Sequence, residues 1–138
     1  MKTLMLTALI FIITLLLPAC EGGSSDKAGP IISDISTSGK VVVISDCPAT
    51  SVTITAKVTD ASKITSVLLW VRVGSDQPFA SISMEAHEDL YSASVKGADL
   101  QGNGYGAMEF YITADDQEGN RGKSPLDNSI QFLPCVSN

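Results

Sequence analysis

The single histidine of the 138-residue chain, His87, is the first residue to consider for chemistry. It stands in the stretch Glu85-Ala86-His87-Glu88-Asp89, where carboxylates surround the imidazole. A nucleophile needs a base that a third group holds in place, and no serine on a rigid element stands near His87 in the sequence. The spacing of these residues matches no closed zinc ligand set. We therefore interpret the stretch as a solvated acidic turn between two strands.

Other catalytic arrangements find no support in the sequence. There is no G-x-S-x-G elbow, and nothing indicates the cleft and fixed separation that a catalytic carboxylate pair requires. The chain carries nine Lys and Arg against 15 Asp and Glu, a formal net charge of −6, whereas nucleic-acid binding needs a basic patch. We expect no enzymatic activity, no cofactor and no nucleic-acid partner.

Alternation of apolar and polar residues predicts strands in the rest of the chain. Apolar residues occupy even positions in 51–59, odd positions in 67–73 and even positions in 108–114. Turn-forming clusters at 74–76, 102–104 and 116–120 separate these segments. No segment after residue 30 has a clear helical period. Seven or eight short strands predict an all-β fold, a single antiparallel β-sandwich.

The N-terminus has the pattern of an export signal. A short basic start precedes an apolar run from Leu4 to Leu17. As a helix this run would extend about 21 Å at ~1.5 Å per residue, short of a ~30 Å hydrocarbon core, so a signal-peptide helix is predicted. The sequence Leu17-Pro18-Ala19-Cys20 that follows resembles a bacterial lipobox. An ordinary secretory signal ending near Ala19, with Cys20 a free or paired thiol, is the alternative.

The lipobox resemblance implies a bacterial lipoprotein, in which cleavage before Cys20 leaves a diacylated first residue. The chain then divides into a signal peptide (1–19), the lipidated cysteine with a Gly/Ser-rich tether (20–30) and a domain (31–138). Ten tether residues of this composition reach roughly 17 Å. The implied location is extracytoplasmic, with the acylated cysteine in the bacterial cell membrane or the outer membrane.

Six short stretches of the domain carry a second resemblance; they are 30–35, 58–64, 66–73, 91–93, 108–116 and 119–120. Together they are similar to bacterial Ig-like, fibronectin-type-III-like modules of surface proteins. The resemblance implies strands at 31–36, 41–45, 51–59, 64–73, 79–84, 91–95, 107–115 and 128–133. It implies architecture and does not identify a ligand.

If Cys20 is lipidated, Cys47 and Cys135 remain as an even pair in an exported domain, where oxidising conditions favour a disulfide. In the Ig-like arrangement the strand at 41–45 runs parallel to the strand at 128–133, so such a bridge would join the C-terminal tail to the corner after the earlier strand. Two buried thiols are the alternative.

Two groups of residues are candidates for binding. The Ig-like arrangement implies that the loops after 51–59 and 107–115 share one end of the domain, so acidic residues there would converge as calcium ligands; they are Asp60, Asp115, Asp116 and Glu118. Because Asp, Asn and Gly also form tight turns without an ion, we expect no bound metal and keep calcium as the alternative.

The second candidate is an outward aromatic face formed by Trp70, Arg72, Glu109 and Tyr111. Alternation directs Trp70 and Tyr111 away from the core, and such aromatics stack on sugars or anchor protein partners. Two alternatives are a purely structural cross-strand aromatic pair flanked by Arg72 and Glu109, and a shifted register that buries Trp70.

These patterns favour a lipid-anchored, extracytoplasmic Ig-like module without catalytic activity. It would bind an unknown protein or glycan, serve adhesion, or act as a spacer. A structural accessory lipoprotein of an envelope assembly is the alternative.

Overall fold

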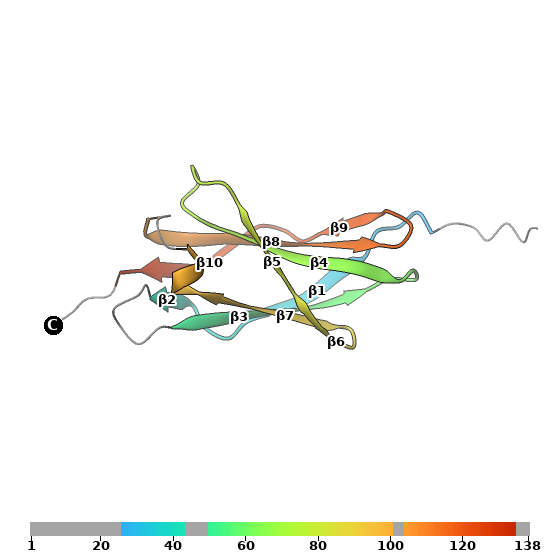
Figure 1. The fold of residues 1–138 in the computed structure, drawn as a ribbon, viewed down its shortest axis with the longest axis horizontal. Coiled ribbons are helices and arrows are strands. Elements are labelled where there is room, and N and C mark those ends of the chain that lie inside the picture. Colours follow the sequence, from blue (N-terminus) through green and yellow to red (C-terminus); the bar gives the residue numbers. More distant parts are fainter. Residues whose placement is uncertain (1–25, 44–49, 101–103, 135–138) are drawn as a thin grey trace, which may run out of the picture.

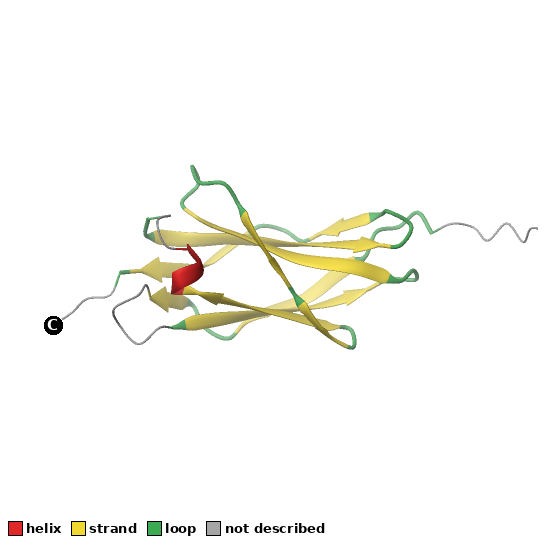
Figure 2. Ribbon diagram, viewed as in Figure 1, coloured by secondary structure: helices red, strands yellow, loops and turns green. Residues whose placement is uncertain are grey.

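The computed structural model describes residues 26–43, 50–100 and 104–134, and these residues form an all-β structure (Figure 2). The predicted all-β class is therefore confirmed. One short 3-10 helix, η1, accompanies the strands. The elements are β1 (Ile31–Thr37), β2 (Val41–Val43), β3 (Ser51–Thr59), β4 (Ile64–Val73), β5 (Ala80–Ser83), β6 (Glu85–His87), β7 (Leu90–Lys96), η1 (Gly97–Leu100), β8 (Gly106–Asp116), β9 (Arg121–Lys123) and β10 (Asp127–Leu133).

The strands form two sheets that lie one over the other (Figure 1). The first sheet has the order β1-β3-β7-β6, and the second has the order β2-β10-β8-β4-β5, with β9 paired to β8. The described pairings are antiparallel except that of β10 with β2, which is parallel. The parallel pairing agrees with the arrangement expected for the strands near 41–45 and 128–133.

The core between the sheets consists of the side chains that the alternation assigns to the inner faces. On β3 and β4 the buried residues stand at every second position, and β8 follows the same pattern except that Thr113 is buried as well. Fully burying one Val, Leu, Ile or Phe side chain contributes about 1.5–3 kcal/mol, which is the main force holding the two sheets together. The largest of these side chains are Phe110, Phe132, Ile54 and Leu69.

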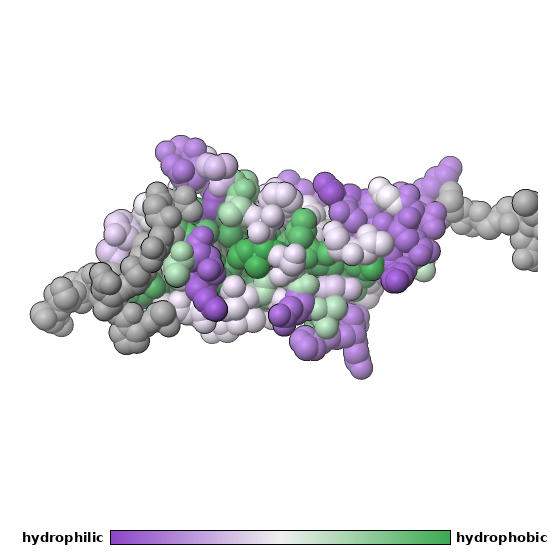
Figure 3. All heavy atoms as spheres, in the orientation of Figure 1, coloured by the Kyte–Doolittle hydropathy of each residue, from purple (hydrophilic) through white to green (hydrophobic). Residues whose placement is uncertain are grey.

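The segment that contains β5 and β6 passes from the second sheet to the first with only Met84 between the two strands. β5 pairs with β4 in the second sheet, and after buried Met84 the chain continues as β6, which pairs with β7 in the first sheet (Figure 1). On either side of this crossing segment Figure 3 shows apolar side chains of the interior, whereas polar side chains gather at the end of the domain that carries the β8–β9 turn.

The prediction of a turn over residues 85–89 was wrong, because residues 85–87 form β6 and the turn is confined to Glu88 and Asp89. Glu88 adopts a positive φ of 61°, which closes the hairpin. All three residues of β6 are exposed, so this edge strand has no apolar alternation to reveal it. β9 and η1 were not predicted either.

Among the residues that the structure describes, no helix is long and apolar enough to cross a membrane. The predicted signal peptide and residues 20–25, which include Cys20, lie outside the described residues, as do Cys47 and Cys135.

Candidate functional site

The outer face of β4 and β8 carries the predicted aromatic residues. Trp70 and Tyr111 are direct partners across the two antiparallel strands. Their ring centroids lie 6.0 Å apart, with 11° between the ring planes. Trp70 is half-buried on this outer face, while its neighbours Leu69 and Val71 are fully buried in the core. The alternative in which a shifted register places Trp70 in the core is therefore wrong.

Polar contacts hold this face in place. Trp70 Nε1 donates a hydrogen bond of 2.9 Å to Thr113 Oγ1. Arg72 and Glu109 are also direct cross-strand partners, with Nε and Nη2 of Arg72 each 2.6 Å from Glu109 Oε2. Because these two side chains are only 21% and 19% exposed, water screens their attraction less than at a fully exposed pair.

Phe79, which was not predicted, completes what we call the aromatic row (Phe79, Tyr111 and Trp70), and Lys123, also not predicted, lies over one of its rings. The Phe79 ring meets Tyr111 edge-on, at 4.9 Å and 70°. Arg72 lies over the Phe79 ring, with Cζ 4.4 Å from its centroid, and Lys123 Nζ lies 4.1 Å from the Tyr111 centroid. Each cation–π contact contributes about 0.5–1 kcal/mol at exposed sites. The row therefore stabilises the sheet, and Arg72 and Lys123 place positive charge over the faces of two of its rings.

Three aspartates converge at one end of the domain, and we call them the aspartate cluster (Asp26, Asp60 and Asp116). Asp60 follows β3, Asp116 ends β8, and Asp26 belongs to the segment before β1. One carboxylate oxygen from each lies within 4.8 Å of the others. The shared end of the β3–β4 and β8–β9 turns is also marked by a hydrogen bond from the Gln117 amide to the Lys63 carbonyl, 2.9 Å long.

Asn120 connects the cluster to the N-terminal segment. Its backbone amide donates to Asp116 Oδ1 at 2.8 Å, and its side-chain amide donates to Asp116 Oδ2 at 2.8 Å and to the Asp26 carbonyl at 2.9 Å. Asp26 in turn accepts hydrogen bonds from the Ala28 amide at 3.0 Å and from Ser62 Oγ at 3.2 Å. Residues far apart in the sequence are thus tied together.

The Asp60 carboxylate is the least satisfied group of the cluster. Its Oδ1 accepts a hydrogen bond of 2.9 Å from the Ala61 amide, but its Oδ2 is buried and has no hydrogen-bond partner among the described residues. Burial raises the pKa of Asp60 above its ordinary value; the Ala61 hydrogen bond opposes this, and the negative charges of Asp26 and Asp116 raise the pKa further.

Asp116 is only 4% exposed, yet it is better satisfied. Burial acts to raise the pKa of Asp116, but the hydrogen bonds from Asn120 and from the Glu118 amide outweigh it, so the pKa is lowered. None of the ion pairs among the described residues includes a member of the cluster.

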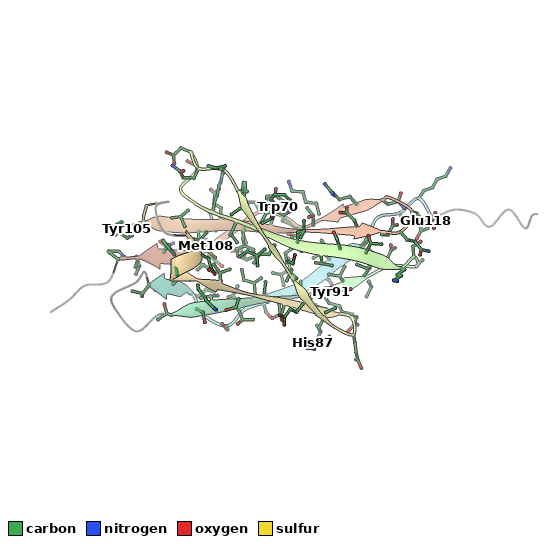
Figure 4. All side chains as sticks on the ribbon, viewed as in Figure 1. Trp70, His87, Tyr91, Tyr105, Met108 and Glu118 are labelled. Atoms are coloured by element: carbon green, nitrogen blue, oxygen red, sulfur yellow. The ribbon has the colours of Figure 1, made fainter. Side chains whose placement is uncertain are left out.

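Two of the predicted calcium ligands lie elsewhere. Asp115 forms a bidentate pair with Arg121, 2.6 Å from Nε and 2.9 Å from Nη2, and also accepts a hydrogen bond from Ser66 Oγ at 3.2 Å. The hydrogen bond from Arg121 lowers the pKa of Asp115 against the opposing effect of burial. Glu118 is exposed in the β8–β9 turn (Figure 4). Along a strand, neighbouring side chains point to opposite faces, which separates Asp115 from Asp116.

Asp26 was not among the predicted site residues, because the Gly and Ser residues around it indicated only a flexible tether. One signal was present: strand β1 starts at the end of the domain where the two acidic turns meet, so a carboxylate shortly before Ile31 falls close to them. His87 lies on β6 in the sheet opposite Trp70 and is exposed, away from both groups (Figure 4).

No protein-family model matches the chain, and no curated protein matches it.

Proposed function

We propose that the protein is a lipid-anchored, non-catalytic Ig-like module of the cell envelope, held through an acylated Cys20 and displayed outside the cytoplasm. The strand pairing supports an Ig-like β-sandwich: β1, β3, β7 and β6 form one sheet, and the parallel β2–β10 pair extends the other. Antibody-type modules likewise pair strands of two sheets in a Greek-key order. The signal-like residues 1–19 and the lipobox resemblance supply the anchor.

The N-terminal segment contacts one particular end of the domain, and this contact carries the proposal. Residues 26–30 contact the β8–β9 end through Asn120, and β10 ends at the opposite end of the long axis (Figure 1). A strand as long as β8 extends roughly 35 Å at ~3.3 Å per residue. An anchored Cys20 would hold the β8–β9 end toward the membrane and display the other end away from it. The module then acts as a spacer or a presented binding surface.

The aromatic row favours binding as a second role. Its rings are half-buried in the isolated chain, and Lys123 is exposed beside Tyr111. Aromatic side chains and arginine are enriched where proteins bind partners. A protein or glycan would contact ring edges and the Lys123 ammonium, because Arg72 and Lys123 already cover ring faces.

A structural accessory role in an envelope assembly is the other candidate. In that case the aromatic row would only stabilise the second sheet and would not contact a partner. Substituting Lys123→Ala should then leave pull-downs from intact envelopes unchanged, whereas a binding role predicts a lost partner without a large change in thermal stability.

The anchor is tested by metabolic labelling with palmitate in the native host. We expect labelling of the wild-type chain and none of Cys20→Ser, with Cys47→Ser as the matched control that keeps the label. Equal labelling of wild type and Cys20→Ser would contradict the lipoprotein assignment.

A further inference from the structure

We propose that Asp26, Asp60 and Asp116 bind one calcium ion, and that this ion fixes the N-terminal strap (residues 26–30) to the end of the domain. The inference goes beyond the proposed function, because it concerns how the domain is joined to its tether and holds whether or not Cys20 is acylated.

The first argument is the unsatisfied burial of negative charge. Asp116 is almost fully buried, and Asp60 Oδ2 is a buried acceptor without a donor. Leaving such an atom unpaired is energetically unfavourable, and buried charges in proteins are paired or coordinate metals. Hydrogen bonds from Asn120 and Ala61 supply part of the compensation, but the Asp60 Oδ2 position is open to a cation.

The second argument is the chemistry and size of the donor set. All three side chains offer carboxylate oxygens, which calcium prefers, whereas zinc favours nitrogen and sulfur ligands. Calcium–oxygen bonds of about 2.3–2.6 Å allow ligand atoms up to roughly 5 Å apart on opposite sides of the ion. The oxygens of the cluster lie within 4.8 Å of one another, so one calcium ion can contact all three. Magnesium demands near-ideal octahedral geometry and gives up its waters reluctantly, so it suits a set of protein carboxylates less well.

The third argument is what the ion would join. Asp26 comes from the strap, Asp60 from the turn after β3, and Asp116 from the end of β8. The strap already rests on β9, because a Cβ built on Gly29 would lie 2.6 Å from the Arg121 carbonyl oxygen. One ion across these segments would add a further link between the strap and the domain, and so set the orientation of the domain on its tether.

The binding test uses the full-length chain, purified in detergent and freed of metal with a chelator. Isothermal titration with calcium chloride should show one site per chain with a Kd of about 0.1–1 mM, the range of extracellular modules, and weaker binding of magnesium chloride. Asp26→Asn and Asp60→Asn should each weaken calcium binding at least tenfold. Asp76→Asn, an exposed aspartate in the β4–β5 loop, is the matched control and should bind as wild type.

A second readout follows the strap directly. Lys27 is exposed next to Asp26, so endoproteinase Lys-C should cleave after it slowly in calcium and several-fold faster in chelator. Asp26→Asn should be cleaved fast in both conditions, and Asp76→Asn should keep the protection. Because Asp26 is on the strap, its substitution leaves the two sheets intact and the test does not depend on folding.

The proposal is overturned if the wild-type chain shows no calcium binding at 5 mM, or if Asp26→Asn binds calcium as tightly as wild type. A Cys20→Ser chain should bind calcium normally, so failure of the acylation test and failure of the calcium test are separate outcomes.

Discussion

Gly122 on β9 lies so close to the backbone of Pro30 that a Cβ on Gly122 would overlap the Pro30 carbonyl oxygen. Pro30 is buried, and a Cβ on the neighbouring Gly29 would lie 2.6 Å from the Arg121 carbonyl oxygen. The structure gives neither glycine a positive φ. Glycine is needed at both positions because two backbones touch, and this contact seats the strap on the second sheet.

Substituting Gly122→Ala should therefore destabilise the domain by about 1–3 kcal/mol, the usual cost of forcing extra atoms into a packed contact. Urea unfolding followed by tryptophan fluorescence measures the change. Gly39→Ala is the control, because its Cβ would meet only Val52 Cγ2 at an ordinary 3.6 Å. Equal effects of the two substitutions would contradict the contact.

The hydrogen bond between Trp70 and Thr113 should account for a measurable part of sheet stability. Thr113 is only 5% exposed, so Trp70→Phe leaves its hydroxyl buried without the indole donor, at a cost of about 1–3 kcal/mol. In a Thr113→Val background the same Trp70→Phe substitution should cost clearly less, because no hydroxyl remains. A double-mutant cycle in urea measures the coupling, and identical costs in both backgrounds would exclude it.

Asp127 should make stability depend on pH at the acid end. Its Oδ1 accepts a hydrogen bond of 2.7 Å from the Ser129 backbone amide, in the irregular part of the β8–β10 pairing. Burial acts to raise the pKa of Asp127, but hydrogen bonds from Ser129 outweigh it, so the pKa lies below its ordinary value of 3.8.

A carboxyl whose pKa is lower in the folded state adds stability above the unfolded pKa and loses it as pH falls through the folded pKa. The free energy of unfolding should therefore decrease as pH falls below about 3.8. Asp127→Asn keeps an acceptor oxygen but does not titrate, so its decrease in urea titrations below that pH should be shallower. A decrease as steep as that of wild type would show that Asp127 contributes nothing to it.

A disulfide between Cys47 and Cys135 is the remaining prediction. The last pair of the parallel β2–β10 ladder is Val43 with Leu133, which supports bringing the following cysteines to one end of the domain. Thiol counting on the denatured, unreduced chain should detect neither cysteine, and reduction should release both. Cys47→Ser and Cys135→Ser should each lower stability by about 4–5 kcal/mol, the value for closing so long a loop. Two free thiols before reduction would contradict the bridge.

The strands with a buried face were predictable from the sequence. β3 and β4 have the predicted bounds, and β1, β7, β8 and β10 differ from prediction by a residue at one or both ends. β6 was missed because its residues are exposed at a sheet edge, where no packing selects an alternating pattern.

The candidate sites were predictable only in part. The alternation placed Trp70 and Tyr111 on one outer face, because side chains two residues apart share a face. Phe79 comes from the loop before β5, and Lys123 comes from β9. The local sequence around neither residue indicates that it contacts Tyr111. Asp26 was assigned to the tether because its local sequence likewise does not indicate that it lies beside Asp60 and Asp116.

The sequence by itself determined which side of each long strand is buried. Side chains two residues apart share a face, so only one face of β3, β4 and β8 can remove their Val, Leu, Ile and Phe side chains from water. Only the tertiary structure decided which polar groups meet. The separation of Asp115 toward Arg121 and the convergence of Asp26, Asp60 and Asp116 depend on contacts between segments far apart in the chain, which local patterns do not encode.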